Sequence, residues 1–185
     1  MKSSPGRLTL PVTAAATFVL VRPHYPENVG AAARALKTMG VTRLVLVKPG
    51  RLAVPGHEMA LKMAVKSTDV LHGSERAPDL ATALRDIPLA FATTSRRGVT
   101  GVRSPREAAG ECAAAAASGL PFAIVFGNEK TGLSEEDLAL CGERLRIPMA
   151  ADQPSINLAQ AVQIVAYELL LAGLARRAAE RAALG

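Results

Sequence analysis

The stretch 146–171, RIPMAADQPSINLAQAVQIVAYELLL, joins a strand-like apolar end, a polar turn and a long apolar helix with almost no linking residues between them. Between residues 156 and 174 the polar side chains fall on one narrow stripe, so we expect this helix to be enclosed in the core. Asn157 can cap the helix start, with Gln160 reaching back as in a capping box and Ser155 exposing a hydroxyl beside them. Such a terminus favours polar or anionic ligands, although the same residues would also serve merely to start a helix. We take this junction as the candidate active site.

Outward from this stretch, short apolar runs alternate with helical patterns along the chain. The runs predict strands at 17–21, 44–47, 89–92, 122–126 and 145–147, and the patterns predict helices at 28–39, 58–66, 79–86, 104–118 and 134–141. This alternation predicts an α/β fold with a mostly parallel sheet and helices on both faces. Ligands of such sheets bind beyond the carboxyl ends of the strands, which here means the segments 93–97, 127–132 and 148–157.

Composition limits the classes of function. The 185 residues are 49% hydrophobic but only 3% aromatic, with no Trp, which argues against a platform for stacking bases. Residues 1–51 hold eight Lys or Arg against the single acid Glu27, and this basic end suits a polyanion or is simply a solvated basic face. A chain of this size most often forms one domain.

Cysteine and histidine are sparse and scattered. Cys112 and Cys141 lie far apart without a partner motif, which fits reduced structural thiols in a cytoplasmic protein, and we expect no metal site. The apolar stretch 8–21 contains small residues before its most apolar part and ends at Arg22, so we expect a buried first strand there and not a signal peptide. We expect no transmembrane segment.

The loop 126–138, FGNEKTGLSEEDL, resembles a phosphate-binding loop only in its glycine spacing. Gly127 and Gly132 are followed by Leu133 and Ser134 where a P-loop requires Lys and Ser or Thr, so we do not expect a P-loop NTPase. No G-x-G-x-x-G sequence occurs either, which removes the signature of an ordinary dinucleotide site. Glu129 would attract a cation or pair with an arginine, or be a solvated loop acid.

Two further segments carry basic side chains. The segment 91–107, FATTSRRGVTGVRSPRE, ends a strand with three hydroxyl residues and then presents Arg96, Arg97, Arg103 and Arg106 around two glycines. A basic loop at the ligand end of a sheet suits an RNA phosphate backbone, and the alternative is a solvated linker. The segment 27–40, ENVGAAARALKTMG, directs Arg34 away from its apolar face, where taken alone it would be a surface residue.

Together, three motifs resemble those of the SPOUT methyltransferases, in the SpoU or TrmH branch that methylates ribose 2′-hydroxyls of RNA. Motif one, N-x-G-x-x-x-R-x-x-x-x-x-G, lies at Asn28, Gly30, Arg34 and Gly40. Motif two, F-G-x-E-x-x-G-L-S, spans 126–134, and motif three, I-P-M followed by S-hydrophobic-N-hydrophobic, spans 147–158. The resemblance covers residues 17–172, and the sequences TTSR and NLAQAVQ are TrmJ-like.

The resemblance implies a C-terminal trefoil knot within a single domain over 1–185, whose ordered core is about 17–172. It implies S-adenosylmethionine as the cofactor, bound among Thr93, Thr94, Gly127, Ile147, Pro154, Ser155, Ile156 and Leu158. It implies catalytic roles for Arg34, Glu129 and Asn157, and RNA contacts for Asn28, Arg96, Arg97 and Arg103. Because a guanidinium stays protonated, we expect Arg34 to clamp a phosphate and stabilise developing alkoxide charge instead of abstracting a proton.

The sequence therefore predicts an RNA 2′-O-methyltransferase, with tRNA favoured over rRNA by the TrmJ-like details. The resemblance also implies a homodimer, since sites of the family are completed across a two-fold interface and the apolar helix 158–171 offers a surface to share. No membrane and no DNA are expected as partners. The alternatives are a non-catalytic RNA-binding module and a small-molecule or protein methyltransferase, and the latter would leave the basic loop 96–106 without a clear purpose.

Overall fold

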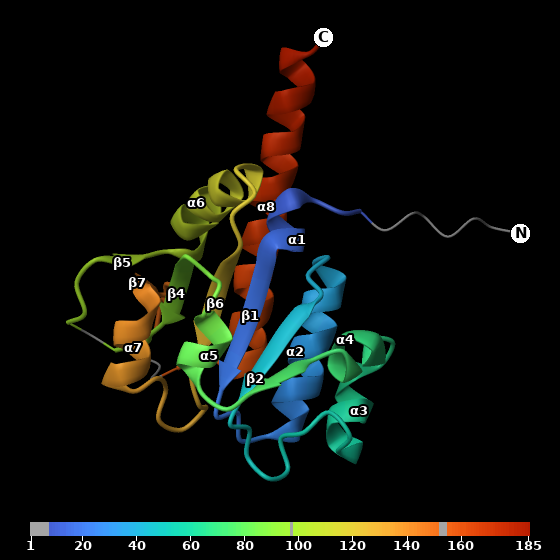
Figure 1. The fold of residues 1–185 in the computed structure, drawn as a ribbon, viewed down its shortest axis with the longest axis vertical. Coiled ribbons are helices and arrows are strands. Elements are labelled where there is room, and N and C mark those ends of the chain that lie inside the picture. Colours follow the sequence, from blue (N-terminus) through green and yellow to red (C-terminus); the bar gives the residue numbers. More distant parts are fainter. Residues whose placement is uncertain (1–7, 97, 152–154) are drawn as a thin grey trace, which may run out of the picture.

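The structure is a computed structural model that describes residues 8–96, 98–151 and 155–185. Helices and strands alternate along most of the chain (Figure 1). The helices are α1 Pro11–Ala15, α2 Pro26–Thr38, α3 Glu58–Ala64, α4 Thr68–His72, α5 Leu80–Leu84, α6 Pro105–Ala117, α7 Glu135–Cys141 and α8 Leu158–Ala183. The strands are β1 Ala16–Val21, β2 Arg43–Val47, β3 Glu75–Ala77, β4 Leu89–Thr93, β5 Val102–Arg103, β6 Phe122–Phe126 and β7 Gly142–Leu145.

In the described part of the chain, the strands form one seven-stranded sheet in the order β3-β2-β1-β6-β4-β7-β5, and every neighbouring pair is parallel. The predicted parallel sheet is therefore confirmed. All residues of β1 and β6 are buried, which explains their uninterrupted apolar sequences, since a parallel strand at the centre of a sheet is covered on both faces.

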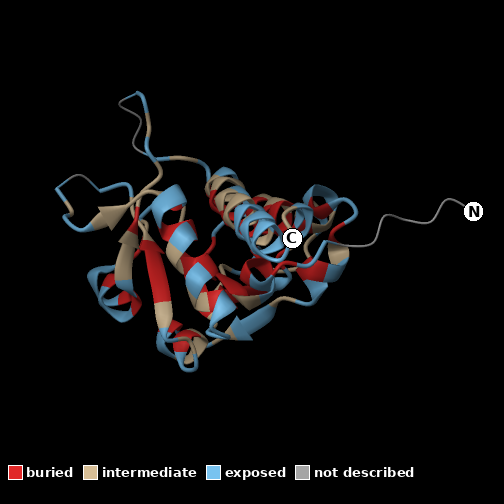
Figure 2. Cartoon of the chain, turned by 90° about the horizontal axis from the view of Figure 1, so that it is seen from above, coloured by how far each residue is buried: buried red, intermediate tan, exposed pale blue. Residues whose placement is uncertain are grey.

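Two separate cores cover the two faces of the sheet. On one face, Phe18, Leu20 and Phe126 pack with buried residues of α2, α6 and α8. On the other face, Val19 and Val125 pack with buried residues of the shorter helices α5 and α7. Figure 2 shows buried residues along the strands and exposed residues on the outer surfaces of the helices. Helices on both faces were predicted, and this is confirmed.

The first glycine of motif one, Gly30, allows two helices to pack closely. A Cβ added at Gly30 would lie 2.0 Å from the carbonyl oxygen of Ala60, so only a glycine allows α2 to pack this closely against α3. This contact fixes the helix that carries Arg34 and Asn28 against its neighbour.

The prediction that the last helix is enclosed is wrong. In α8, Leu158, Val162, Val165, Ala166, Leu169 and Gly173 are buried, whereas Tyr167 and Leu174 are exposed. Helices α1, α2 and α6 pack against α8, and its C-terminal end projects past the sheet in Figure 1. Among the described residues, α8 is the one helix long and apolar enough to cross a membrane, but core helices of soluble proteins also meet this criterion.

Other differences from the predictions lie at the edges of elements. The strand predicted at 145–147 is β7, which begins and ends earlier and pairs through Gly142, Glu143 and Arg144 with β4. The short strands β3 and β5 and the short helices α1 and α4 were not predicted. Backbone pairing with a neighbouring strand, and not an apolar run, defines β3 and β5.

Cys112 and Cys141 are both buried and free, as the sequence predicted. Burial raises the pKa of each thiol to about 12, so both remain protonated at neutral pH. Cys141 also donates to the backbone carbonyl of Asp137 at 3.3 Å.

Candidate active site

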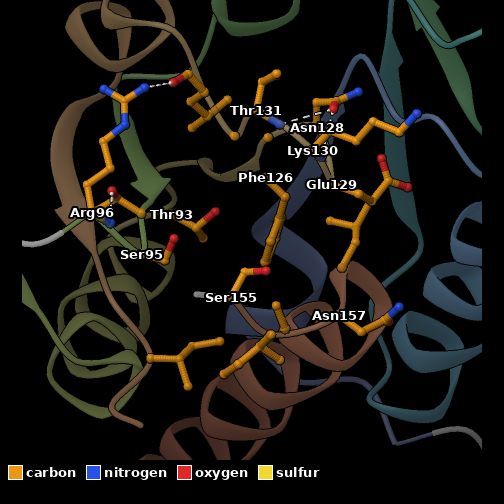
Figure 3. A pocket seen from close by; sticks show the side chains of 18 of the residues that line it. Thr93, Ser95, Arg96, Phe126, Asn128, Glu129, Lys130, Thr131, Ser155 and Asn157 are labelled. Carbon is orange, nitrogen blue, oxygen red and sulfur yellow. Dashed lines mark hydrogen bonds between the residues drawn. The ribbon is translucent and has the colours of Figure 1, made fainter. Parts of the chain in front are cut away.

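A cavity of about 490 Å³ opens beyond the carboxyl ends of β4, β6 and β7. The loops that follow these three strands surround it, as predicted, and Figure 3 shows their side chains on its walls. Seven of the eight residues predicted to bind the cofactor line the cavity: Thr93, Thr94, Gly127, Ile147, Ser155, Ile156 and Leu158. The eighth, Pro154, lies outside the described residues.

Glu129 binds the start of α2. Its carboxylate accepts hydrogen bonds from the backbone N–H groups of His24 at 2.8 Å and Tyr25 at 3.3 Å, and from the side-chain amide of Asn28 at 2.8 Å. The N-cap residue of α2, Tyr25, makes no side-chain cap of its own, so Glu129 supplies the acceptors and the negative charge that a helix start favours. Among the described residues the carboxylate of Glu129 is thus occupied by neutral N–H donors, and its expected attraction for a cation or an arginine stays a prediction.

Asn28 extends this network to motif three. The side-chain carbonyl oxygen of Asn28 accepts a hydrogen bond from the side-chain amide of Asn157 at 3.0 Å. The side-chain oxygen of Asn157 accepts from the backbone N–H groups of Ala159 at 2.9 Å and Gln160 at 3.3 Å, which confirms the predicted cap by Asn157. The expected return hydrogen bond from the side chain of Gln160 is not present among the described residues. One chain of hydrogen bonds thus joins all three motifs at the rim of the cavity.

The glycines of motif two allow the loop after β6 to return on itself. A Cβ at Gly127 would lie 2.3 Å from the carbonyl carbon of Gly132 and 2.4 Å from the nitrogen of Leu133. Gly132 has a φ of +69°, which a side chain rarely tolerates. The nearest neighbour of Gly127 is therefore protein backbone, and this contact alone requires a glycine.

Arg96 connects two walls of the cavity. Its guanidinium forms an ion pair with Glu135 and donates to the carbonyl of Leu133 at 2.8 Å, while its own carbonyl accepts from the guanidinium of Arg146. Arg96 therefore stabilises the loop after β6, and its contact with RNA stays a prediction.

The other arginines of the basic loop are similarly occupied. Arg103 forms ion pairs with Glu111 and Glu143, and its guanidinium carbon lies 5.9 Å from the centre of the Phe91 ring. Arg106 donates to both carboxylate oxygens of Glu168, at 3.1 and 3.0 Å. These pairs reduce the positive charge that Arg103 offers to RNA, and Arg97 lies outside the described residues.

Arg34 lies apart from the cavity. It is exposed on α2, as predicted, and its side chain makes no hydrogen bond or ion pair with another described residue. Arg34 is also not among the described residues that line the cavity. The three predicted catalytic residues therefore separate into a connected pair, Glu129 and Asn157, and an exposed guanidinium outside the cavity.

Arg22 and Asp137 form a partly buried ion pair beside the loop after β6 that was not predicted from the sequence. Arg22 follows β1 with a φ of +51° and forms an ion pair with Asp137, whose carboxylate also accepts from the backbone N–H of Ser134 at 2.9 Å. Burial alone would raise the pKa of Asp137, but the hydrogen bonds from Arg22 and Ser134 outweigh burial and lower it. A charged residue directly after a buried strand, and an acid three residues after a helix-capping serine, were the available signals.

The sequence and fold of this chain are similar to those of known methyltransferases. The model of the SpoU rRNA Methylase family matches residues 15–167. The tRNA (cytidine/uridine-2′-O-)-methyltransferase TrmJ of Pectobacterium atrosepticum is 37% identical over 161 residues, which are 86% of this chain and 65% of that protein. This chain thus spans about two thirds of the length of that curated relative.

Two solved structures are also similar. A probable methyltransferase from Bordetella pertussis Tohama I has a TM-score of 0.82 and 36% identity, covering 87% of this chain and 97% of that chain. TrmJ from Z. mobilis ZM4 has a TM-score of 0.75 and 36% identity, covering 85% of this chain and 69% of that chain. Because the family match includes all three motifs and every strand of the described sheet, the chain belongs to the SpoU rRNA methylase family.

Proposed function

We propose that this chain is an S-adenosylmethionine-dependent RNA 2′-O-ribose methyltransferase that acts on tRNA in the cytoplasm. The hydrogen-bonded junction of Glu129, Asn28 and Asn157 carries this proposal, because it joins the three motifs of the family at the rim of one cavity. The name of the TrmJ relative from Pectobacterium atrosepticum, a tRNA 2′-O-methyltransferase, supports tRNA as the substrate.

The cavity fits S-adenosylmethionine. Its volume of about 490 Å³ lies in the range of small-molecule sites, and its wall is divided between two kinds of side chain. Leu133, Leu138 and Ile147 offer an apolar surface for an adenine ring, and Thr131 and Ser155 offer hydroxyl groups to the ribose and the amino-acid part. When bound, the cofactor supplies a methyl group on a positively charged sulfur, which an oxygen nucleophile can attack.

The side chains of this protein act mainly by positioning. Glu129, Asn28 and Asn157 hold the starts of α2 and α8 in one arrangement, so the RNA side and the cofactor side of the site are fixed relative to each other. Arg34 presents a guanidinium that binds a phosphate and stabilises the negative charge that develops on the 2′-oxygen.

A homodimer is part of this proposal. Arg34 does not line the cavity within the described part of its own chain, and α8 exposes Tyr167 and Leu174 beside its buried face. A two-fold contact through this face would cover apolar surface and bring the Arg34 of one subunit toward the site of the other. Light scattering at micromolar concentration should give twice the mass of 19.3 kDa, and a monomer mass would contradict the dimer.

The trefoil knot is also part of this proposal. The backbone N–H of Thr94 donates to the carbonyl of Leu145 at 2.9 Å, and the backbone N–H of Arg146 donates to the carbonyl of Arg103 at 2.8 Å. The chain that leaves β7 therefore runs against the loop that follows β4. A knot requires the segment 146–157 to pass through that loop on its way to α8. A crystallographic trace in which this segment runs outside the loop 94–103 would contradict the knot.

Mapping of methylated nucleotides tests the function. The protein should be incubated with S-adenosylmethionine and either unfractionated tRNA or rRNA, and new 2′-O-methyl groups located by their resistance to alkaline cleavage. We expect a single modified position in tRNA. Methylation of rRNA alone would overturn tRNA as the substrate, and RNA binding without any methyl transfer would favour a non-catalytic module.

A further inference from the structure

Three side chains outside the hydrogen-bonded junction form a cluster at the mouth of the cavity: His24, Tyr25 and Lys130, which we call the mouth cluster. The Nζ of Lys130 lies 3.2 Å from Nε2 of His24 and 5.8 Å from the centre of the Tyr25 ring. The rings of His24 and Tyr25 meet edge to face, with their centres 4.7 Å apart. All three residues are exposed, and Tyr25 and Lys130 line the cavity (Figure 3 labels Lys130).

Tyr25 is unusual among the aromatic residues of this chain. The four phenylalanines are all buried in the core, and the other tyrosine, Tyr167, lies on the exposed side of α8. Tyr25 is 43% exposed at the entrance of the candidate active site. The low aromatic content argued against a base-stacking platform, but it did not reveal that one ring is exposed at the position where a substrate would enter.

The backbone of the mouth cluster is fixed. Glu129 accepts from the backbone N–H groups of His24 and Tyr25, and the side chain of Asn128 accepts from the backbone N–H of Lys130 at 2.9 Å. Asn128 also donates to the carbonyl of Arg22, which ties the loop after β6 to the chain leaving β1. The ring and the ammonium group are therefore held by the same loop that carries motif two.

We propose that Tyr25 stacks on the base of the nucleotide whose ribose enters the cavity, while Lys130 and His24 bind a phosphate beside it. This inference rests on the proposed function and adds a recognition site to it. A nucleotide whose base has left the stack of its neighbours can place its ribose deep in a cavity, and an aromatic ring at the entrance replaces the stacking that the base loses. An ammonium group close to that ring provides the opposite charge for the sugar–phosphate chain.

Tyrosine fluorescence tests the stacking directly, because the chain has two Tyr and no Trp. In Tyr167→Phe, Tyr25 is the single emitting tyrosine, and in Tyr25→Phe only Tyr167 remains. Titration with unfractionated tRNA should quench the emission of Tyr25 and leave that of Tyr167 nearly unchanged after correction for absorbance. Inorganic polyphosphate, which has charge but no bases, should bind without quenching Tyr25.

Kinetics supply a second measurement. Tyr25→Ala should raise the KM for tRNA on the order of five- to a hundredfold, the range expected for one base–aromatic stack, with the KM for S-adenosylmethionine unchanged. Tyr25→Phe should recover most of this loss, because it keeps the ring. Lys130→Gln should reduce the salt dependence of tRNA binding by about one counterion, whereas the matched variant Lys62→Gln, on α3, should not.

The outcomes separate this inference from the proposed function. If Tyr25→Ala methylates tRNA with an unchanged KM, or if tRNA binds without quenching Tyr25, the stacking role is overturned while the methyltransferase activity stands. Quenching by tRNA in a protein that transfers no methyl group would support the stacking role and overturn the proposed function. Circular dichroism of each variant should match the wild type, since Tyr25 and Lys130 are both exposed.

Discussion

The side-chain amide of Asn157 donates to the side-chain carbonyl of Asn28 at 3.0 Å, although the two residues are 129 positions apart. Asn28 lies in the first turn of α2 and Asn157 caps α8, so this hydrogen bond connects the starts of the two helices. Because Asn28 also donates to Glu129, its amide can satisfy both neighbours only in one orientation. Asn28 is therefore the centre of the network and not only a residue on its RNA side.

Asn28→Asp should disrupt this network. Asn28 is 8% exposed, and a carboxylate in its place would face the carboxylate of Glu129 without a hydrogen to donate. We expect the free energy of unfolding to fall by about 1–3 kcal/mol in urea titrations, together with a loss of methyl transfer. The double variant Asn28→Asp, Glu129→Gln restores a donor to this pair and should recover part of the stability. Additive losses in the double variant would contradict direct coupling of the two residues.

Asp137 should make stability depend on pH in the acidic range. Its folded pKa lies below the ordinary value of 3.8, so its contribution is complete above that value and is lost as the pH falls through the lower folded pKa. The melting temperature should be measured from about pH 5 to about pH 2. It should fall more steeply with decreasing pH in the wild type than in Asp137→Asn. Parallel curves for the two proteins would show that the ion pair with Arg22 contributes nothing.

Neither cysteine should react with a thiol reagent in the native protein. Burial raises the pKa of Cys112 and Cys141 to about 12, so almost no thiolate is present at mildly alkaline pH. Ellman's reagent should release colour from the native protein only slowly, and should titrate both thiols after unfolding in urea. Rapid reaction of one thiol in the folded protein would mean that its environment is open to solvent.

Arg34→Lys should lower methyl transfer strongly and leave cofactor binding unchanged. Lysine keeps the charge but loses the planar fork of donors, and removal of one preorganised donor costs about 3–4 kcal/mol, or about a hundred- to thousandfold in rate. Calorimetry with S-adenosylmethionine should give wild-type affinity, since Arg34 does not line the cavity of its own chain within the described residues. Arg43→Lys is the control, because Arg43 is the first residue of β2 and does not line the cavity at the carboxyl ends of the strands. Near-normal turnover of Arg34→Lys would mean that Arg34 is an ordinary solvated residue without a role in catalysis.

The apolar pattern predicted most of the sheet because burial on both faces demands it. Four of the five predicted strands were found nearly in full, from Thr17 to Phe126, whereas β7 was placed late because its pairing residues, such as Glu143 and Arg144, are polar. The edge strands β3 and β5 have three and two residues and bury little, so no periodicity could reveal them.

The site was predictable as a set of loops but not as a set of contacts. The parallel sheet requires the loops after β4, β6 and β7 to meet, which follows from the order of strands and helices. The pairing of Arg106 with Glu168, 62 positions away, depends on how α6 packs against α8, which the sequence does not specify. For the same reason the basic loop was interpreted as free charge, and the hydrogen bonds of Glu129 to the start of α2 were not predicted.

If the 2′-hydroxyl of a tRNA nucleotide accepts the methyl group, a tRNA that lacks this one hydroxyl cannot be methylated. Once the modified position has been mapped, two synthetic tRNAs should be compared in single-turnover reactions, one all-ribose and one with a single 2′-deoxy nucleotide at that position. We predict complete methylation of the first and none of the second, with similar binding of both to the protein. Methyl transfer to the 2′-deoxy tRNA would contradict the account, because the acceptor would then be a base or another nucleotide.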